Sequence, residues 1–178
     1  MTPISRPRRH ALGICLVEFL FRDGLLEGAG LRMRAACGRA GVAARKVEGD
    51  GVTPIANLPL LRVLYRADRI SPPRCAVPLE PISPQDGWCD DIADPSYNKP
   101  VRLPYAGRYE ELWREDALYD IIGVLGWNTG PIIPGLGSAI FLHVATPDYA
   151  PTAGCIALSP PDVLACLAAG MDGIQVRL

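Results

Sequence analysis

Two residues of this chain, His143 and Cys155, have the types and the spacing for nucleophilic acyl transfer. The histidine lies near the end of an apolar run, residues 139–145, and the cysteine follows it by twelve positions, directly after Gly154. An imidazole can take the proton of a neighbouring thiol, and the thiolate is the reactive nucleophile. The other histidine, His10, has no comparable neighbour in the sequence. We therefore predict that Cys155 is a nucleophile and that His143 is its general base.

The order of the two residues separates this pair from other cysteine enzymes. Papain-like enzymes place the cysteine before the histidine, and caspases place the histidine about 50 residues before a Gln-Ala-Cys sequence that is absent here. Two structural alternatives stay open. A free cysteine is among the most buried residue types, and a histidine on a strand can be a satisfied core side chain.

Residues 152–156 read Thr-Ala-Gly-Cys-Ile and follow a strand that ends near histidine. This segment resembles the catalytic motif of the L,D-transpeptidase family, also called YkuD-like, in which Ser/Thr-x-Gly-Cys precedes an apolar residue. The resemblance covers residues 30–178, and we expect residues 1–178 to form a single catalytic domain of this type. Further similar segments are residues 49–54, with a Thr-Pro element, and residues 86–91, 97–104 and 112–116, which look like a bacterial subgroup.

The resemblance also implies roles for the residues around the pair. Backbone N–H groups at Gly154 and Cys155 would form the oxyanion hole. Thr152, Ala153 and Val144 would belong to the oxyanion and substrate-binding part of the site. A backbone carbonyl at Val144 or a neighbour would fix the tautomer of the imidazole, since no carboxylate is obviously placed to do so.

The chain departs from the family pattern at four positions. The family often has glycine after the histidine, a large polar residue before Gly-Cys and arginine two residues after the cysteine. This chain has Val144, Ala153 and Ala157 there, and Ala56 replaces a usual glycine after the Thr-Pro element. We expect side-chain contacts to the substrate to differ, whereas backbone N–H groups do not depend on the side chain. The Thr-Pro element itself is interpreted as structural.

The resemblance implies acyl transfer on peptidoglycan stem peptides, with a thioester on Cys155 and without a metal or organic cofactor. An amine acceptor would make the protein an L,D-transpeptidase of cell-wall cross-linking or remodelling, and water would make it an L,D-carboxypeptidase or another hydrolase. Two further hypotheses stay open. One is a non-catalytic cell-wall binding module, and the other is a cytoplasmic cysteine hydrolase or acyltransferase that acts on recycled stem peptides.

Composition excludes several other classes of function. The chain has 18 basic and 19 acidic residues and no long basic block, so we expect no nucleic-acid partner. No segment is long enough to span a membrane. No pair of cysteines has C-x-x-C spacing, and Cys89-Asp90-Asp91 has no histidine near it, so we expect no metal site and mostly reduced, buried cysteines. The cysteines are at positions 15, 37, 75, 89, 155 and 166.

The N-terminal segment bears on the compartment. A basic cluster in residues 6–9 precedes an apolar stretch, residues 11–21, which faintly resembles a signal peptide. Glu18 interrupts the stretch and no clean cleavage site follows, so we expect a strand over residues 12–22 instead. The family resemblance still implies the periplasm or cell envelope, and the cytoplasm stays open. The oligomeric state is not predicted.

The elements that must position the pair are expected to be mostly strands. Glycine and proline number 18 each, which favours turns and short strands over long helices. The expected fold class is mainly β, a β-sandwich-like L,D-transpeptidase catalytic domain with one or two short helices. We expect strands within residues 12–22, 27–34, 58–67, 119–127, 139–145 and 173–178.

One or two short helices are expected. Ser159, two prolines and Asp162 form a strong helix start, and Gly170 is a natural stop. A second short helix is predicted over residues 109–118. Residues 71–104 hold eight prolines, which exclude a long helix and favour an extended excursion over the surface.

Five residues outside the motif are weaker candidates for substrate contact. Arginine and aromatic side chains near a groove could hold the carboxylate and glycan of a stem, and they could equally be packing or capping residues. The five are Tyr97, Asn98, Arg102, Trp127 and Asn128.

Overall fold

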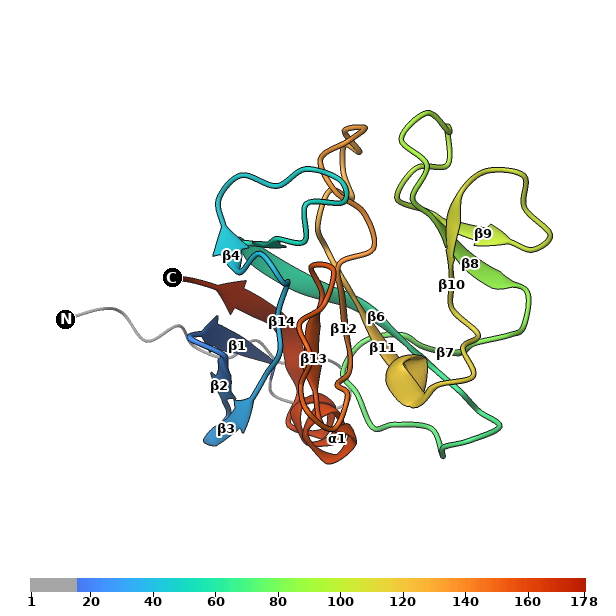
Figure 1. The fold of residues 1–178 in the computed structure, drawn as a ribbon. Coiled ribbons are helices and arrows are strands. Elements are labelled where there is room, and N and C mark those ends of the chain that lie inside the picture. The colour runs from blue at the N-terminus through green and yellow to red at the C-terminus, as the bar shows by residue number, and fades with distance from the viewer. Residues whose placement is uncertain (1–15) are drawn as a thin grey trace.

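The computed structural model describes residues 16–178, and a nine-stranded sheet runs through the middle of the molecule (Figure 1). One edge strand, β13 (Ile156–Leu158), pairs in parallel with β12 (Phe141–Val144), which pairs antiparallel with β11 (Ile121–Leu125). The path through the sheet is β13 (Ile156–Leu158), β12 (Phe141–Val144), β11 (Ile121–Leu125), β6 (Asn57–Tyr65), β14 (Met171–Val176), β1 (Val17–Arg22), β2 (Leu25–Gly28) and β3 (Leu31–Arg34), with β7 (Leu79–Pro81) on β6.

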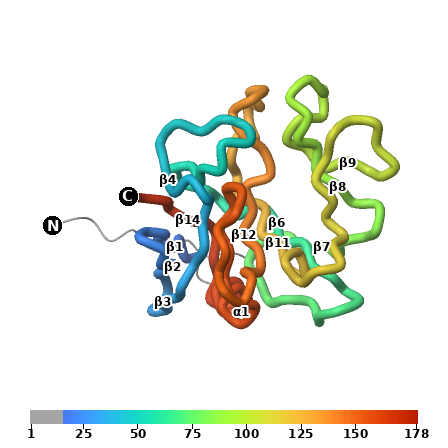
Figure 2. Tube along the Cα trace, viewed as in Figure 1, coloured from blue at the N-terminus to red at the C-terminus, as the bar shows by residue number. Residues whose placement is uncertain are grey.

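Two small sheets complete the strand structure. One has the order β10 (Tyr109–Glu111), β8 (Asp86–Cys89) and β9 (Pro100–Arg102), and it lies to the right of the main sheet in Figure 1. The other joins β4 (Val42–Ala43) to β5 (Thr53–Pro54) in parallel. Figure 2 shows the chain rising into loops above β4, above β12 and above β8, on the same side of the molecule.

The strands β12 and β13 are buried on both faces. Leu142, Val144 and Ile156 contribute to one core, against which the helix α1 (Pro160–Ala168) packs. Phe141 and Cys155 contribute to a second core on the opposite face. Such continuous burial is typical of strands covered from both sides.

The helix α1 confirms the start signal that the sequence carries. The Ser159 side chain accepts from the Asp162 N–H at 3.3 Å, as expected for an N-cap. Its apolar side turns Val163, Cys166 and Leu167 into the core, where all three are fully buried. No described helix in residues 16–178 is both long and apolar enough to cross a bilayer.

The mainly β fold class is confirmed, but the helix predicted over residues 109–118 is wrong. Tyr109–Glu111 form β10 and pair antiparallel with β8, and only Ala117–Tyr119 make a turn of 3₁₀ helix, η1, capped by Asp116. Tertiary pairing overrides the local pattern here, because Glu110 lies opposite Trp88 in the small sheet.

Residues 71–104 contain no helix, as their prolines predict, but they do more than cross the surface. Trp88 of β8 is 4 % exposed and its ring meets Phe141 of the main sheet edge-on, with centroids 5.3 Å apart. Residues 71–104 therefore contribute, through Trp88, to the second core. The expected strand at residues 12–22 is found from Val17, and the predictions for Cys15, His10 and the basic cluster lie outside the described residues.

Candidate active site

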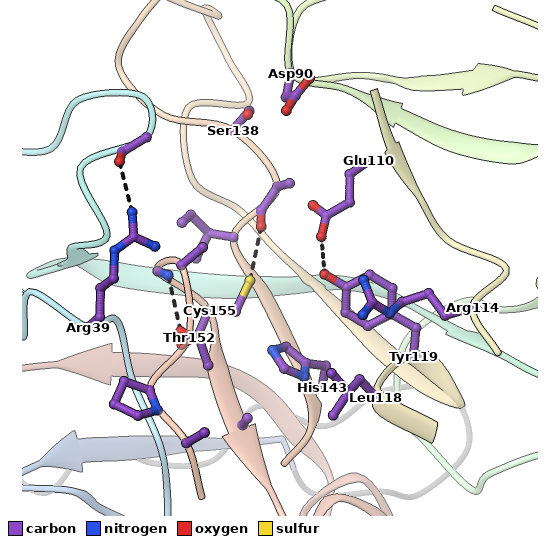
Figure 3. A pocket seen from close by; sticks show the side chains of 18 of the residues that line it. Arg39, Asp90, Glu110, Arg114, Leu118, Tyr119, Ser138, His143, Thr152 and Cys155 are labelled. Atoms are coloured by element: carbon purple, nitrogen blue, oxygen red, sulfur yellow. Dashed lines mark hydrogen bonds between the residues drawn. The ribbon is translucent and has the colours of Figure 1, made fainter. Parts of the chain in front are cut away.

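The register of β12 and β13 brings His143 and Cys155 to the same face of the sheet. His143 pairs with Ala157 across the parallel strands. Cys155 lies directly before β13 and packs in the same core as Phe141, which points to the same face as His143 because the two are two residues apart on β12. Both side chains line one cavity of about 620 Å³, which β10 and η1 close from the other side (Figure 3).

The Cys155 thiol is held by two main-chain groups. Its Sγ accepts from the Phe141 N–H at 3.3 Å and donates to the Ala139 carbonyl oxygen at 3.2 Å. Burial raises the pKa of Cys155 to about 12, and the carboxylate of Glu110 adds to the rise. The Phe141 N–H and the ammonium of Lys46 oppose it. The resting thiol is therefore neutral, and it would have to lose its proton to act as a nucleophile.

This thiol should react slowly with iodoacetamide at neutral pH. Because the pKa of Cys155 is raised to about 12, the thiolate fraction grows about tenfold per pH unit up to and beyond pH 10. Peptide mass mapping of Cys155 after alkylation at pH 7, 8, 9 and 10 measures this rise. A rate that levels off between pH 7 and 9 would show a thiolate formed in the free protein and would contradict the neutral resting thiol.

The His143 ring is oriented by a backbone carbonyl. Its Nδ1 lies 2.8 Å from the Val144 oxygen, which can only accept, so Nδ1 carries the proton and Nε2 keeps a lone pair. Burial lowers the pKa of His143, although the main chain of Val144 partly opposes this. The edge of the ring meets Tyr119, with centroids 5.3 Å apart. The imidazole is therefore neutral and can accept a proton.

The loop before Cys155 is fixed by the Thr152 hydroxyl. It accepts from the Gly154 N–H at 3.1 Å and donates to the Cys155 carbonyl at 2.6 Å. Gly154 has a φ of +142°, and a β-carbon there would lie 2.8 Å from the Val52 carbonyl oxygen. Ala153 lines the cavity and is exposed, whereas the Val144 side chain lies in the opposite core and takes part through its carbonyl alone.

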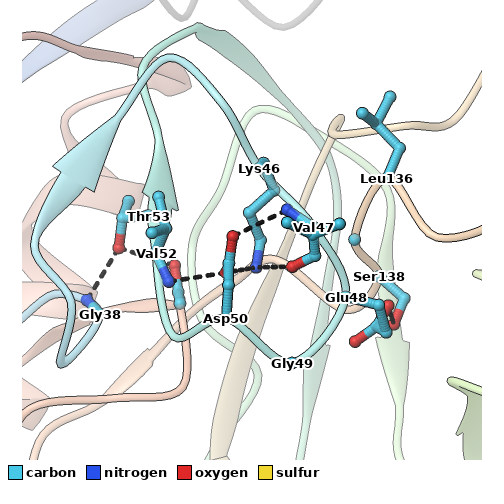
Figure 4. Close-up of polar contacts among 12 residues, drawn as sticks. Gly38, Lys46, Val47, Glu48, Gly49, Asp50, Val52, Thr53, Leu136 and Ser138 are labelled. Atoms are coloured by element: carbon cyan, nitrogen blue, oxygen red, sulfur yellow. Dashed lines mark hydrogen bonds and ion pairs between the residues drawn. The ribbon is translucent and has the colours of Figure 1, made fainter.

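The Thr-Pro element anchors this loop from behind. The hydroxyl of Thr53, which is fully buried, donates to the Gly154 carbonyl at 2.8 Å and accepts from the Gly38 N–H at 2.8 Å (Figure 4). The structural interpretation of this element is confirmed. Thr53 therefore determines where Gly154 lies, and through it where Cys155 begins.

A buried lysine lies beside the same loop and was missed by sequence reasoning. The Lys46 ammonium pairs with Asp50 at 2.5 Å and donates to the Val47 carbonyl at 3.1 Å (Figure 4). Its nitrogen lies 3.7 Å from the point that a β-carbon on Gly154 would occupy. Burial would raise the pKa of Asp50, but Lys46 and two main-chain N–H groups lower it overall. The signal was present, since only two of the 18 basic residues are lysines.

Sequence reasoning also missed the residues that form the cavity wall opposite Cys155. Glu110 of β10 and Tyr119 of η1 line the cavity, and the Tyr119 hydroxyl donates to the Glu110 carboxylate (Figure 3). Arg114 lies over the Tyr119 ring, 5.1 Å from its centroid, and pairs with Asp116. Residues 112–116 are singled out only as a segment similar to the family, and nothing in the sequence indicates that Glu110 faces the cavity, because residues 109–118 are predicted to be a helix.

The five weaker candidates do not line the cavity. Asn98 is 4 % exposed, and its side-chain oxygen accepts from Trp88 Nε1 at 3.0 Å and from the Ala139 N–H at 3.1 Å. Its amide nitrogen donates to the carbonyls of Trp127 and Asn128 at 3.0 and 2.8 Å. All hydrogen-bonding groups of this amide are therefore used within the protein. Asn98 holds Ala139, whose carbonyl accepts the Cys155 thiol.

Two of the others are structural as well. The Tyr97 hydroxyl donates to Glu48 at 2.5 Å and accepts from the Gly137 N–H at 3.0 Å, which ties the loops above β8, β4 and β12 together. Arg102 is exposed and pairs with Asp86 at the edge of the small sheet. The alternative that these are packing or capping residues therefore fits better than substrate contact.

The remaining cysteines of residues 16–178 are free thiols, and within that range no three potential ligand side chains gather as a metal site would require. Cys166 lies in the core, as predicted. Two cysteines, Cys37 and Cys75, are only partly buried. The cavity around Cys155 thus combines a neutral thiol, a neutral imidazole and a loop shaped by glycine.

One comparison with known proteins gives a match. The model of the YkuD family, the L,D-transpeptidase catalytic domain, matches residues 18–176. No curated protein and no solved structure matches the chain. The matched range contains both motif residues, His143 and Cys155, and every strand of the main sheet except the first residue of β1.

Proposed function

Because this chain belongs to the L,D-transpeptidase catalytic domain family, whose members act on peptidoglycan, we propose that it transfers acyl groups of stem peptides through a thioester on Cys155. The observation that carries the proposal is the shared cavity. His143 comes from β12, Cys155 directly precedes the adjacent parallel strand β13, and both side chains line the same space. A thiol and a neutral imidazole in that relation are the groups that acyl transfer needs.

The first half of the reaction follows from the protonation states. Nε2 of His143 takes the thiol proton while Sγ turns from the Ala139 carbonyl to the substrate carbonyl between the L-centre of a diamino acid and a D-residue. The tetrahedral intermediate then collapses as its C–N bond breaks. The proton on His143 passes to the leaving D-alanine amine, and the thioester remains on Cys155.

The oxyanion of that intermediate needs donors that are already in place. We propose the backbone N–H groups around Gly154 and Cys155, which the positive φ of Gly154 orients. Since the Gly154 N–H already donates to the Thr152 hydroxyl, the Cys155 N–H carries the larger share. Ala153 offers a small surface at the cavity for the substrate, and Val144 acts through the His143 tautomer.

The second half of the reaction transfers the acyl group to an amine, which gives cell-wall cross-linking or remodelling. Transfer to water would make the protein an L,D-carboxypeptidase. The family context also supports an action in the cell envelope and one catalytic domain across the chain, with the cytoplasm as the alternative compartment.

Product analysis tests this function. A disaccharide-tetrapeptide stem incubated with the protein should release D-alanine and give a cross-linked dimer, a tripeptide stem or both. Cys155→Ala should release none, and Cys75→Ala, which removes a partly buried thiol that does not line the cavity, should behave as the wild type. A folded wild type that binds the stem and releases nothing would favour the non-catalytic binding module.

A further inference from the structure

Glu110 is a half-buried carboxyl group that lines the catalytic cavity and that the first half of the reaction does not use. It comes from β10, on the wall opposite the thiol, and accepts from the Tyr119 hydroxyl (Figure 3). Tyr119 in turn meets the His143 ring at 5.3 Å. One side chain therefore separates Glu110 from the imidazole that handles protons.

The charge of Glu110 works against the formation of a thiolate. A negative charge at Glu110 raises the pKa of Cys155, as a nearby like charge must. Burial raises the pKa of Glu110 itself, while Tyr119 and Arg114 lower it in part. A carboxyl group that is partly removed from water and lies near a nucleophile carries a desolvation cost. Any contribution of Glu110 to catalysis therefore belongs to a step other than the attack of Cys155 on the donor stem.

The second half of the reaction has a requirement that Glu110 meets. An amine acceptor reaches the cavity as an ammonium ion, which cannot attack a thioester until it loses a proton. Three further carboxylate side chains line the same cavity, together with the basic side chains of Arg39, Lys46 and Arg114, so four acidic and three basic side chains face the acceptor. The three further carboxylates are Glu48, Asp90 and Glu111.

We propose that Glu110 binds the ammonium group of the acyl acceptor and takes one proton from it, so that the acceptor of this protein is an amine in preference to water. The inference rests on the proposed function. The neutral amine forms a C–N bond with the thioester carbonyl, and the C–S bond to Cys155 breaks. The second amine proton passes through His143 to the departing thiolate, and Glu110 returns its own proton to solvent.

The partition of the acyl-enzyme between amine and water tests this role. The donor is an isotope-labelled disaccharide-tetrapeptide stem, and the acceptor is an unlabelled disaccharide-tripeptide stem with a free side-chain amine, so that the hydrolysed donor differs in mass from the acceptor. We expect Glu110→Gln to acylate Cys155 at least as fast as the wild type, because a charge that disfavours the thiolate is gone. We expect its ratio of cross-linked dimer to hydrolysed tripeptide to fall about tenfold or more.

The Glu110 and Glu115 variants are chosen to preserve the fold and to distinguish proton transfer by Glu110 from a general effect of surface charge. Glutamine preserves the shape of Glu110 and an acceptor for the Tyr119 hydroxyl, and Glu110→Asp should recover part of the ratio. Glu115→Gln, at an exposed carboxylate that does not line the cavity, should leave the ratio unchanged. An unaltered ratio in Glu110→Gln, with the adduct on Cys155 present, would overturn the inference alone. An absent adduct in the wild type would overturn the proposed function and the inference together.

Discussion

Replacing His143 by asparagine should slow the acylation of Cys155 by about 10²–10⁴-fold, the range that a positioned general base supplies. The side-chain amide of asparagine can still donate to the Val144 carbonyl, as Nδ1 does at 2.8 Å. It offers no basic nitrogen in place of Nε2. Since the pKa of Cys155 is raised to about 12, the thiol has few other routes to a thiolate at neutral pH.

The pH dependence distinguishes a base from a packing residue. Burial lowers the pKa of His143, so its basic form persists to a lower pH than that of an ordinary histidine. The acid limb of kcat/KM in the wild type should therefore lie below pH 6.5, and His143→Asn should lose that limb. Rapid-quench measurements of the acyl-enzyme between pH 4.5 and 8 check this. A variant with the same profile at a slightly lower rate would show that His143 only packs.

Replacing Gly154 by alanine should destabilise the protein by about 2–5 kcal/mol and remove nearly all activity. Its φ of +142° is a conformation that residues with a β-carbon avoid. The new methyl group would lie 2.8 Å from the Val52 carbonyl, a main-chain atom that cannot move aside without displacing Thr53. Thermal and urea unfolding, followed by circular dichroism, measure the loss.

Gly41→Ala is the matched control for this prediction. Gly41 also has a positive φ, +74°, but a β-carbon there meets nothing within 4 Å. It should therefore cost about 1 kcal/mol, the strain of the backbone alone, and leave the activity intact. If Gly154→Ala and Gly41→Ala lost equal amounts of unfolding free energy, the close approach of Gly154 to the Val52 carbonyl would add nothing to the cost of the substitution.

The sequence predicts those parts of the fold that local patterns determine. The helix start at Ser159 and the apolar run that becomes β12 need only neighbouring residues, and both appear where they were expected. The segment of Glu110 was mistaken for a helix because its structure depends on pairing with β8, some 20 residues away along the chain. Local propensity carries no information on such a partner.

The same division applies to the site. His143 and Cys155 were predicted as a pair because their types and spacing are unusual, and in the structure both line the cavity beside β12 and the start of β13. Lys46 and Glu110 reach the cavity from loops and strands far away in the sequence, so only the folded chain brings them to it. For Asn98, the sequence suggested a functional role that the structure does not support. It looked like a substrate contact, but the structure uses all its hydrogen-bonding groups internally.

Intact-protein mass spectrometry is the most direct test of the claim that Cys155 carries an acyl group. The purified protein is mixed with a disaccharide-tetrapeptide stem, quenched in acid within seconds and weighed, with Cys155→Ala in parallel. We predict a mass increase equal to the stem less D-alanine in the wild type and no increase in Cys155→Ala. The same adduct in both proteins, or turnover by Cys155→Ala, would contradict the thioester mechanism.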